Sequence, residues 1–384
     1  MTHSEYRVQI LKLDEFDDKL ISQWNELEDQ AIEPNGYLSP HFVMPAARHI
    51  VNKDNVFGML VEKTNRGGYP QLSGLGLFQL SKPSKYFPLP HLTAFRSNHS
   101  YLSGFLAHRD SFEDVMHHIF EYLIAQSHKW HALVIHDHLR EGISATTETE
   151  TAKLLGARWA GYRKWNRAAL QPQKSQGDLN SNLSKNTRKS FKRRMRRLEE
   201  LGKVDWKVYR GENLDSCILD RFMDLEHLGW KGQQRTSVLS NLADKNFFLE
   251  MMAGFHRADK AFATELTLND QTISSTVNFV SGNAGFAFKI GWDPAYSKFS
   301  PGILNEVKWL ECHDEFINGL QFIDSGSSED AAYINSLWTD QRAMESGVYA
   351  LTGAGKLALP LVSMAARAKN ILKRKDDLHK KTEG

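Results

Sequence analysis

The segment FAFKIGWDPAYSKFSPGIL, residues 286–304, carries the clearest information about the fold of this chain. Residues 286–292 are rich in aromatic side chains and predict a strand. Ser300-Pro301-Gly302 then predicts a helix start, because proline suits the first helical position and glycine lets backbone N–H groups approach a ligand. Free N–H groups at a helix N-terminus attract anions, and Lys298 adds a nearby cation. The turn therefore predicts a pyrophosphate site, with an ordinary helix start after a loop as the alternative.

The residues on either side of this segment predict the rest of a sheet. Strands are expected at 261–268, 272–280 and 284–292, with turns at Asn269-Asp270 and Ser281-Gly282-Asn283 between them, which indicates an antiparallel meander. A helix to about residue 317 and a strand at 320–323, ending at Asp324, follow. The first half repeats this order, with a helix from 111 to 128, a strand at 132–135 and then Asp137. The repeat suggests an internal duplication, although a strand–helix–strand unit is common enough to recur by chance.

The length of 384 residues suits two domains, and a content of 41% hydrophobic and 24% charged residues argues against wholesale disorder. We expect an α/β fold with mixed sheets in two lobes. The expected boundaries are residues 1–170 for the first lobe, 171–184 for a polar linker, 185–350 for the second lobe and 351–384 for a basic helical tail.

Basic residues are concentrated in a predicted helix from about 185 to 201, where eight Lys or Arg lie between 185 and 197. The net charge of the whole chain is only +2, and Phe191 is the single aromatic residue of this helix. Nucleic acid is therefore not expected as a partner, since stacking aromatics are missing. A solvated helix, or one that faces a phosphate-bearing ligand, is expected instead. The basic tail is a candidate for peripheral contact with an anionic membrane.

The sequence predicts neither disulfides nor a metal site. Cys217 and Cys312 are too few for a disulfide framework, and His136 and His138 face the same side of a strand without a third ligand at suitable spacing. The N-terminal residues lack the pattern of a signal peptide, and no apolar stretch is long enough to span a membrane. We therefore expect a cytoplasmic protein.

Several motifs resemble those of GNAT acetyltransferases, in particular the CelD/BcsL-like branch that is related to FemABX proteins. The resemblance covers about residues 180–350, and one feature departs from it: Tyr333 is not followed by the lysine that many relatives carry. The matching segments are residues 183–189, 225–232, 286–302, 323–326 and 335–338, together with Arg342.

The resemblance implies two tandem GNAT-like lobes, the second of which binds acetyl-CoA or another acyl-CoA without a metal. The implied reaction transfers the acyl group to an amine or hydroxyl acceptor, such as a saccharide or lipid precursor in polysaccharide biosynthesis. The implied pyrophosphate contacts are Lys298, Ser300, Pro301, Gly302 and Ile303. The candidate catalytic residues, as proton acceptors, are Asp324, Glu226 and His227. The candidate substrate contacts are Trp230, Lys289, Tyr333, Asn335 and Trp338.

Each of these candidate residues could instead have a purely structural role. Asp324 suits a loop cap, Glu226 and His227 suit a solvated helix face, and the tryptophans suit core packing. Two other functions also stay open. One is a FemABX-type aminoacyltransferase that uses aminoacyl-tRNA, and the other is a non-catalytic binding module in polysaccharide or membrane assembly.

Overall fold

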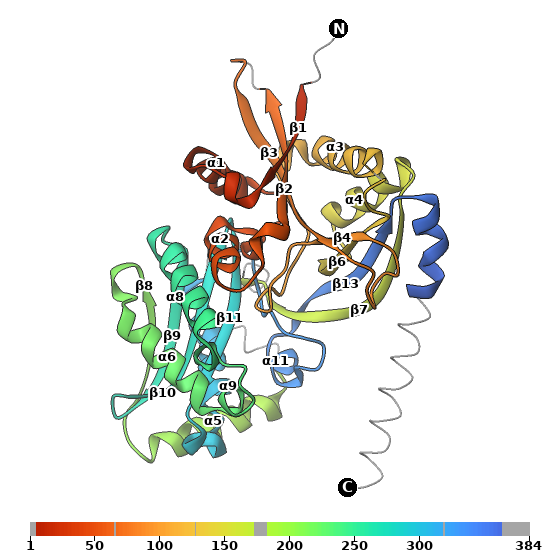
Figure 1. Cartoon of the computed structure of the whole chain (residues 1–384). Helices are drawn as coiled ribbons and strands as arrows, with labels where there is room; N and C mark the ends of the chain where they lie inside the picture. Colours follow the sequence, from red (N-terminus) through yellow and green to blue (C-terminus); the bar gives the residue numbers. More distant parts are fainter. Residues whose placement is uncertain (1–4, 65–66, 127, 173–182, 318, 363–384) are drawn as a thin grey trace. The chain divides into compact units, whose positions relative to one another are not determined.

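The computed structural model describes residues 5–64, 67–126, 128–172, 183–317 and 319–362, which divide into two compact units (Figure 1). Of the described residues, unit 1 contains 5–33, 52–165 and 343–362, whereas unit 2 contains 34–51 and 166–342. This division differs from the expected lobe boundaries. Residues 34–51 belong to the second unit, and the last strand of the chain lies mostly in the first. The linker residues 173–182 and the tail beyond residue 362 lie outside the described part.

Unit 1 is built on a mixed sheet with the strand order β1-β2-β3-β4-β6-β13-β7, in which β5 also pairs with β3. The pairs β1–β2, β2–β3, β3–β4 and β6–β13 are antiparallel, whereas β4 and β6 run parallel. The strands are β1 (Tyr6–Lys12), β2 (Val56–Thr64), β3 (Pro70–Ser81), β4 (His91–Ala94), β5 (Phe105–Ala107), β6 (Ala132–Leu139), β7 (Arg158–Leu170) and β13 (Asp340–Ala350). The helices are α1 (Asp18–Gln30), α3 (Phe112–Ala125) and α4 (Ile143–Leu154).

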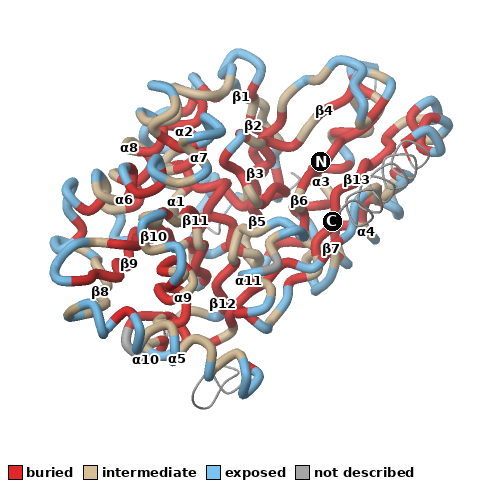
Figure 2. Tube along the Cα trace, turned by 90° about the horizontal axis from the view of Figure 1, so that it is seen from below, coloured by how far each residue is buried: buried red, intermediate tan, exposed pale blue. Residues whose placement is uncertain are grey.

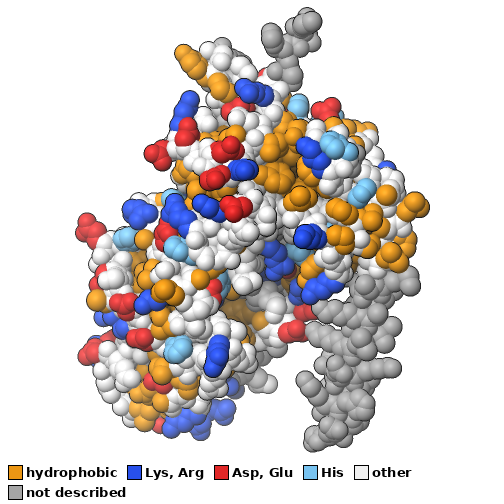
Figure 3. All heavy atoms as spheres, viewed as in Figure 1, with side chains coloured by type: hydrophobic (Ala, Val, Ile, Leu, Met, Phe, Trp, Pro, Cys, Tyr) orange, Lys and Arg blue, Asp and Glu red, His pale blue; other side chains and the backbone are white. Residues whose placement is uncertain are grey.

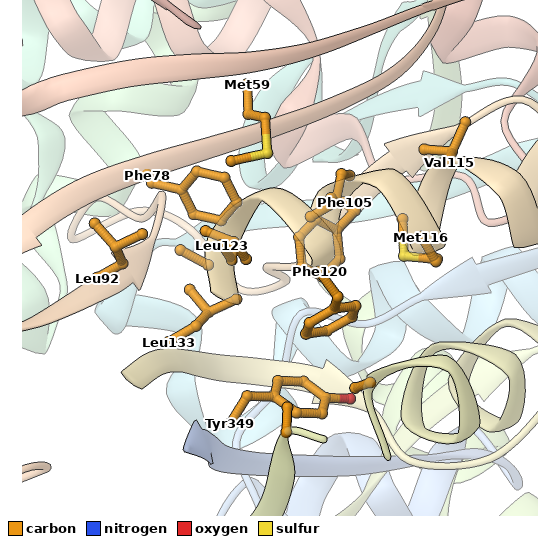
Figure 4. Packing of buried hydrophobic residues seen from close by; sticks show 14 of the residues in the cluster. Met59, Phe78, Leu92, Phe105, Val115, Met116, Phe120, Leu123, Leu133 and Tyr349 are labelled. Atoms are coloured by element: carbon orange, nitrogen blue, oxygen red, sulfur yellow. The ribbon is translucent and has the colours of Figure 1, made fainter. Parts of the chain in front are cut away.

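The core of unit 1 forms where α3 packs on this sheet (Figure 4). Val115, Ile119 and Leu123 recur every four residues and lie on one face of α3, and all three are fully buried. Side chains from the strands, among them Met59 and Phe78, pack against this face. The hydrophobic pattern of the sequence thus fixes which side of the helix meets the sheet.

Unit 2 contains the predicted meander. Its strand order is β7-β12-β11-β10-β9-β8, with β11 and β12 parallel and the other pairs antiparallel. The strands are β8 (Val204–Arg210), β9 (Ala261–Leu268), β10 (Gln271–Ser281), β11 (Ala284–Trp292) and β12 (Phe322–Asp324), and residues 166–170 of β7 complete the sheet. The helices are α2 (Pro40–His49), α5 (Lys185–Glu199), α6 (Ser216–Leu228), α7 (Trp230–Gln233), α8 (Leu242–Arg257), α9 (Pro301–Glu311), α10 (His313–Phe316) and α11 (Ala332–Leu337). The mixed α/β fold expected from the sequence is confirmed.

Helices cover both faces of the sheet in unit 2. Neighbouring residues of a strand point to opposite faces. Accordingly, Glu265 of β9 meets Arg221 of α6, with guanidinium nitrogens 2.9 and 3.0 Å from the carboxylate oxygens, whereas Thr264 bonds to Asn305 of α9 at 2.8 Å. The strands between these layers are largely buried, as Figure 2 shows.

Aromatic packing explains why residues 34–51 belong to unit 2. The ring of Tyr37 lies 5.3 Å from that of Phe279 and 5.7 Å from that of Phe286. Phe42 of α2 adds a contact with Phe279 at 6.4 Å. A Cβ at Gly36 would lie 2.6 Å from the Phe279 ring, so any larger residue at this position would force the ring to shift. Within the described residues, no helix has both the length and the apolar character that a membrane crossing requires.

Candidate functional site

The two parallel strands β11 and β12 separate from each other soon after they pair. Their pairing runs only from Ala284 with Phe322 to Phe286 with Asp324. The β10–β11 register shifts next, because Val277 pairs with Lys289 and Asn278 with Ala287, which leaves Phe288 as an extra residue. Such a bulge bends its strand. Strand β12 ends at Asp324, so residues 287–292 of β11 run on without pairing to it.

Helix α9 begins at Pro301, after the short turn that follows β11. Ser300 precedes it in the left-handed conformation, with φ 57°, and its side chain does not cap the helix. Pro301 occupies the first helical position, and the first turn has no acidic residue. The first N–H groups of a helix lack partners within the helix and carry partial positive charge. The helix start predicted at Ser300-Pro301-Gly302 is thus present, and its role in anion binding stays a prediction.

Gly302 sets how closely this helix approaches the strand. A Cβ there would lie 3.2 Å from the Trp292 ring and 3.3 Å from the Ile290 side chain. These contacts are tighter than almost all real Cβ contacts, so glycine favours the observed approach. Large side chains at position 302 would disrupt packing as well as any ligand site.

Two cations lie at the turn. Nη1 of Arg194 in α5 donates a hydrogen bond to Oγ of Ser300 at 3.2 Å. Lys298 is exposed and lies over the Phe299 ring at 4.9 Å. Figure 3 shows the Lys and Arg side chains gathered over α5 at the lower edge of the view. The basic helix therefore adds positive charge to the N-terminus of α9 and lies where the sequence expected a ligand-facing helix.

A groove of about 490 Å³ lies between α5 and α9. Phe191 and Met195 from α5, and Leu304 and Val307 from α9, supply its apolar lining. Arg188, Lys192 and Arg196 add positive charge along the α5 side, and the carboxylates of Glu199 and Glu311 also line the groove. The groove can thus accept an apolar or aromatic group attached to an anion.

A buried amide holds α9 in place on the sheet. Oδ1 of Asn305 accepts hydrogen bonds from Trp206 Nε1 and Thr264 Oγ1, each at 2.8 Å. Its Nδ2 donates to the Thr264 carbonyl and to Ser274 Oγ, each at 3.3 Å. These partners belong to β8, β9 and β10, so one side chain ties the helix to three strands. Rigid support of this kind fixes the position of the helix N-terminus.

Glu226 forms a buried charged cluster with two lysines. Its Oε1 accepts from Lys231 Nζ at 2.9 Å and lies 3.5 Å from Lys289 Nζ, and its Oε2 accepts from the Val238 N–H at 2.9 Å. Burial favours the protonated acid, but Lys289, Lys231 and this N–H together lower the pKa of Glu226. Burial also lowers the pKa of Lys231, the charge of Glu226 opposes that shift, and Lys289 adds to it. Glu226 is therefore held in its charged form and is a poor proton acceptor.

The two other predicted residues at this end of unit 2 are more exposed. Nδ1 of His227 lies 2.8 Å from Ser237 Oγ, and the residue is exposed. Trp230 is 54% exposed at the start of α7, two residues after α6 ends. An exposed tryptophan beside the charged cluster of Glu226 is available for contact with an acceptor.

Asp324 is fully buried between two arginines. Its carboxylate accepts from Arg342 Nη1 at 2.5 Å, from Arg167 Nη1 at 3.4 Å and from the Gly326 N–H at 2.7 Å. Burial opposes the charged form, but Arg167 and Arg342 lower the pKa of Asp324 below its ordinary value. An ion-paired carboxylate of this kind holds a strand end together and does not readily accept a proton. The expected role as the proton acceptor is therefore not supported by the geometry.

The predicted substrate contacts after β12 divide into two groups. Trp338 is fully buried, with its ring 5.6 Å from that of Trp309, so it packs in the core and is not placed to touch a substrate. Nδ2 of Asn335 donates to the Glu329 carbonyl at 3.4 Å. Tyr333 remains 47% exposed at the surface of α11.

Glu306 is a titratable residue that the sequence analysis missed. It lies one helical turn after Gly302, is 5% exposed, and its Oε2 has no hydrogen-bond partner among the described residues. Burial raises the pKa of Glu306 to about 8. The pKa of the Tyr333 hydroxyl is raised to about 12. The larger cause is the loss of hydration, and the smaller one is the charge of Glu306. The signal in the sequence was an acid within the apolar stripe of a predicted helix.

Among the described residues, no group of three or more His, Cys, Asp or Glu is arranged to hold a metal ion. His136 and His138 take different partners: Tyr162 Oη lies 2.6 Å from His136, and Glu148 lies 2.9 Å from His138.

Comparison with known proteins identifies the type of domain. Residues 185–331 match the family model described as an acetyltransferase (GNAT) domain. No match is found among curated proteins. The GNAT-type domain that the sequence motifs predicted is thus confirmed for unit 2, whereas the CelD/BcsL-like branch stays a prediction.

Three solved structures share the fold over most of the chain. FemX is 12% identical, with 86% of this chain and 96% of that chain covered and a TM-score of 0.56. A C-terminal DUF2156 domain from Agrobacterium fabrum, provisionally assigned to a lysylphosphatidylglycerol synthetase, is 10% identical, with 90% and 94% covered and a TM-score of 0.52. A conserved protein of unknown function from Bacteroides thetaiotaomicron is 9% identical, with 88% and 99% covered and a TM-score of 0.53. At such identities the likeness concerns the fold alone.

Proposed function

We propose that unit 2 transfers an acyl group from acyl-CoA to an amine or hydroxyl acceptor. The observation that carries this proposal is the N-terminus of α9, where the Ser300 side chain does not cap the helix and Arg194 and Lys298 are adjacent cations. Backbone N–H groups together with cations suit a pyrophosphate. The neighbouring groove between α5 and α9, with both apolar and charged lining residues, would take part of the remainder of a CoA-like molecule. An acyl-CoA donor would place the reaction in the cytoplasm.

In the proposed reaction, the acceptor nitrogen or oxygen attacks the thioester carbonyl. A bond forms between acceptor and acyl carbon, the carbon–sulfur bond breaks, and the acceptor proton passes through a base to the leaving thiolate. Glu306 lies one helical turn after Gly302 and is protonated near neutral pH, because burial raises its pKa to about 8, so it is our candidate to donate a proton to the leaving thiolate.

The acceptor is proposed to be a saccharide or a lipid precursor. Trp230 supplies an exposed ring on which a sugar can stack, close in sequence to Lys231 of the charged cluster. Polysaccharide biosynthesis is the process that the sequence motifs suggest. An acceptor screen with amino sugars and phosphorylated sugars would test this part.

An aminoacyl-tRNA is the second candidate donor, which the fold similarity to FemX favours. Both donors are polyanions that a basic helix such as α5 can attract. A CoA pyrophosphate needs the α9 N-terminus, whereas a long RNA needs an extended basic surface. A non-catalytic binding module remains the third candidate and requires neither donor.

Isothermal titration with acetyl-CoA tests the proposed donor site. Ser300→Asp puts a negative charge at the turn, and Ser300→Asn is its neutral control of similar shape; both residues tolerate the left-handed backbone. Arg194→Glu reverses the second charge, with Arg193→Glu on the exposed side of α5 as its control. We expect saturable binding by the wild type and both controls, weakened about tenfold or more in Ser300→Asp and Arg194→Glu.

Absence of heat with acetyl-CoA and with longer acyl-CoAs would refute the CoA-dependent proposal. A filter-binding assay with aminoacyl-tRNA, and with uncharged tRNA as control, would then separate the second candidate from the third. Equal affinity in all variants would show that CoA binds elsewhere on the chain.

A further inference from the structure

Unit 1 has its own pair of parallel strands that separate at one end. The pairing of β4 with β6 consists of Leu92 with Leu133 and Thr93 with Val134. Strand β6 continues to Leu139, but the chain after Ala94 leaves it. Ligands in α/β sheets often bind outside the carboxyl ends of parallel strands. Residues that gather there in unit 1 are therefore worth testing for a binding role.

This edge of unit 1 differs from the α9 site. The first turn of α3, the helix between β4 and β6 in the chain, contains Glu113 and Asp114. Two carboxylates at a helix N-terminus repel an anion and satisfy its N–H groups. A second CoA site like that of unit 2 is therefore not expected in unit 1.

Three cationic side chains lie close enough to His136 of β6 for their charges to lower its pKa. Arg96 follows β4 and is half-buried, and it has neither a hydrogen bond nor an ion pair within the described residues. Lys85 is exposed and lies over the Tyr86 ring at 5.1 Å. Arg163 of β7 lies over the Trp165 ring at 4.1 Å, with Nη1 3.8 Å from Asp137 Oδ1. Asp137 thus lies beside Arg163, whereas Lys85 and Arg96 have no ion pair within the described residues.

His136 forms the buried floor of this cluster. It is 6% exposed, its Nδ1 lies 2.6 Å from Tyr162 Oη, and the Tyr86 ring meets it edge-on at 4.6 Å. The rings of Tyr86 and Tyr162 stack at 5.8 Å. Burial first, and then the surrounding cations, lower the pKa of His136 to about 3, so the imidazole is neutral. Neutral polar groups and aromatic rings line a site whose charge comes from Lys85, Arg96 and Arg163.

We propose that unit 1 binds a phosphate or diphosphate ester at the cluster of Lys85, Arg96, Arg163, His136 and Tyr162. Arginines recognise phosphate oxygens with two parallel N–H bonds, and an arginine without a carboxylate partner keeps these donors available. The stacked tyrosines would contact the organic part of the ester. The site lies within unit 1 and is independent of the acyl-CoA proposal for unit 2.

The test uses inorganic pyrophosphate as the probe, titrated into the full chain at low salt and followed by isothermal titration. All measurements use a Ser300→Asp, Arg194→Glu background, in which both changes weaken anion binding at the α9 turn of unit 2. Arg96→Gln and Lys85→Gln remove single charges from the cluster. Lys153→Gln, which removes an exposed charge on α4, is the matched control.

We expect saturable pyrophosphate binding that Arg96→Gln weakens about tenfold or more and Lys85→Gln weakens less, with no change in the control. Succinate, a dicarboxylate probe of similar charge, is expected to bind far more weakly. Absence of saturable binding in this background, equal affinity in Arg96→Gln and Lys153→Gln, or equal affinity for succinate would each overturn the proposal. A circular dichroism spectrum of each variant verifies that it is folded.

Discussion

Replacing Glu306 by Gln should change how the stability of unit 2 depends on pH. Burial raises the pKa of this carboxyl from 4.5 to about 8, so the folded chain keeps a proton that the unfolded chain releases. Its contribution to stability is complete below about pH 4.5 and decreases as the pH rises toward 8. Gln carries no charge at any of these pH values, and the variant should lack this decrease.

The size of the effect follows from the shift. At 1.36 kcal/mol per pH unit, a shift from 4.5 to about 8 corresponds to roughly 5 kcal/mol as an upper limit. Part of this is lost if water enters beside the unpaired Oε2, so a few kcal/mol is the working expectation. The free energy of unfolding of the wild type should therefore fall by about that amount, relative to the variant, between about pH 5 and pH 8.5.

Urea denaturation at several pH values measures this difference. The pH slope is the readout, because a buried Gln amide also brings an offset that does not depend on pH. Glu311→Gln, on the same helix and paired with Lys308 at 2.7 Å near the surface, is the control and should keep the wild-type slope. Parallel slopes for Glu306→Gln and the wild type would refute the idea that Glu306 is held protonated.

Two further variants test the residues that position the site. Asp324→Asn removes the buried carboxylate that accepts from Arg167 and Arg342 and should cost about 3–5 kcal/mol of unfolding free energy in urea, whereas Asp220→Asn on the exposed side of α6 should change little. Asn305→Ala removes the bonds from α9 to β8, β9 and β10 and should cost about 2–3 kcal/mol, measured by urea denaturation, with unchanged stability counting against the network.

Local patterns in the sequence were sufficient to predict the meander and the helix start at Pro301. The expected strands 261–268, 272–280 and 284–292 correspond to β9, β10 and β11 within one residue at each end. Alternation, turn residues and proline position act over a few residues, and these features are visible in the chain itself. Strands β7 and β13 were missed because they carry many polar residues and are defined by distant partners.

The environment of the charged candidates could not be read from the sequence. Asp324 is paired with Arg167, which lies 157 residues away in the chain, and with Arg342, 18 residues away. Only the fold brings these groups together, and the pairing changes a candidate base into a structural ion. Glu226 likewise lies beside Lys289, which is 63 residues away in the chain, and this charge lowers its tendency to accept a proton. Motif matching located the region of the site but not the charge state of its residues.

The position of β13 has a consequence for how the chain folds as it leaves the ribosome. This strand lies between β6 and β7 in the sheet of unit 1, yet it is encoded after residue 340. An N-terminal fragment that stops at residue 170 would leave the edges of β6 and β7 open, and open edges promote aggregation. Unit 1 therefore cannot complete its sheet until nearly all of the chain has been synthesised. Unit 2 can therefore assemble before unit 1, although most of unit 1 comes earlier in the sequence. Expression of either unit alone calls for a fusion of separate segments, not for a single cut.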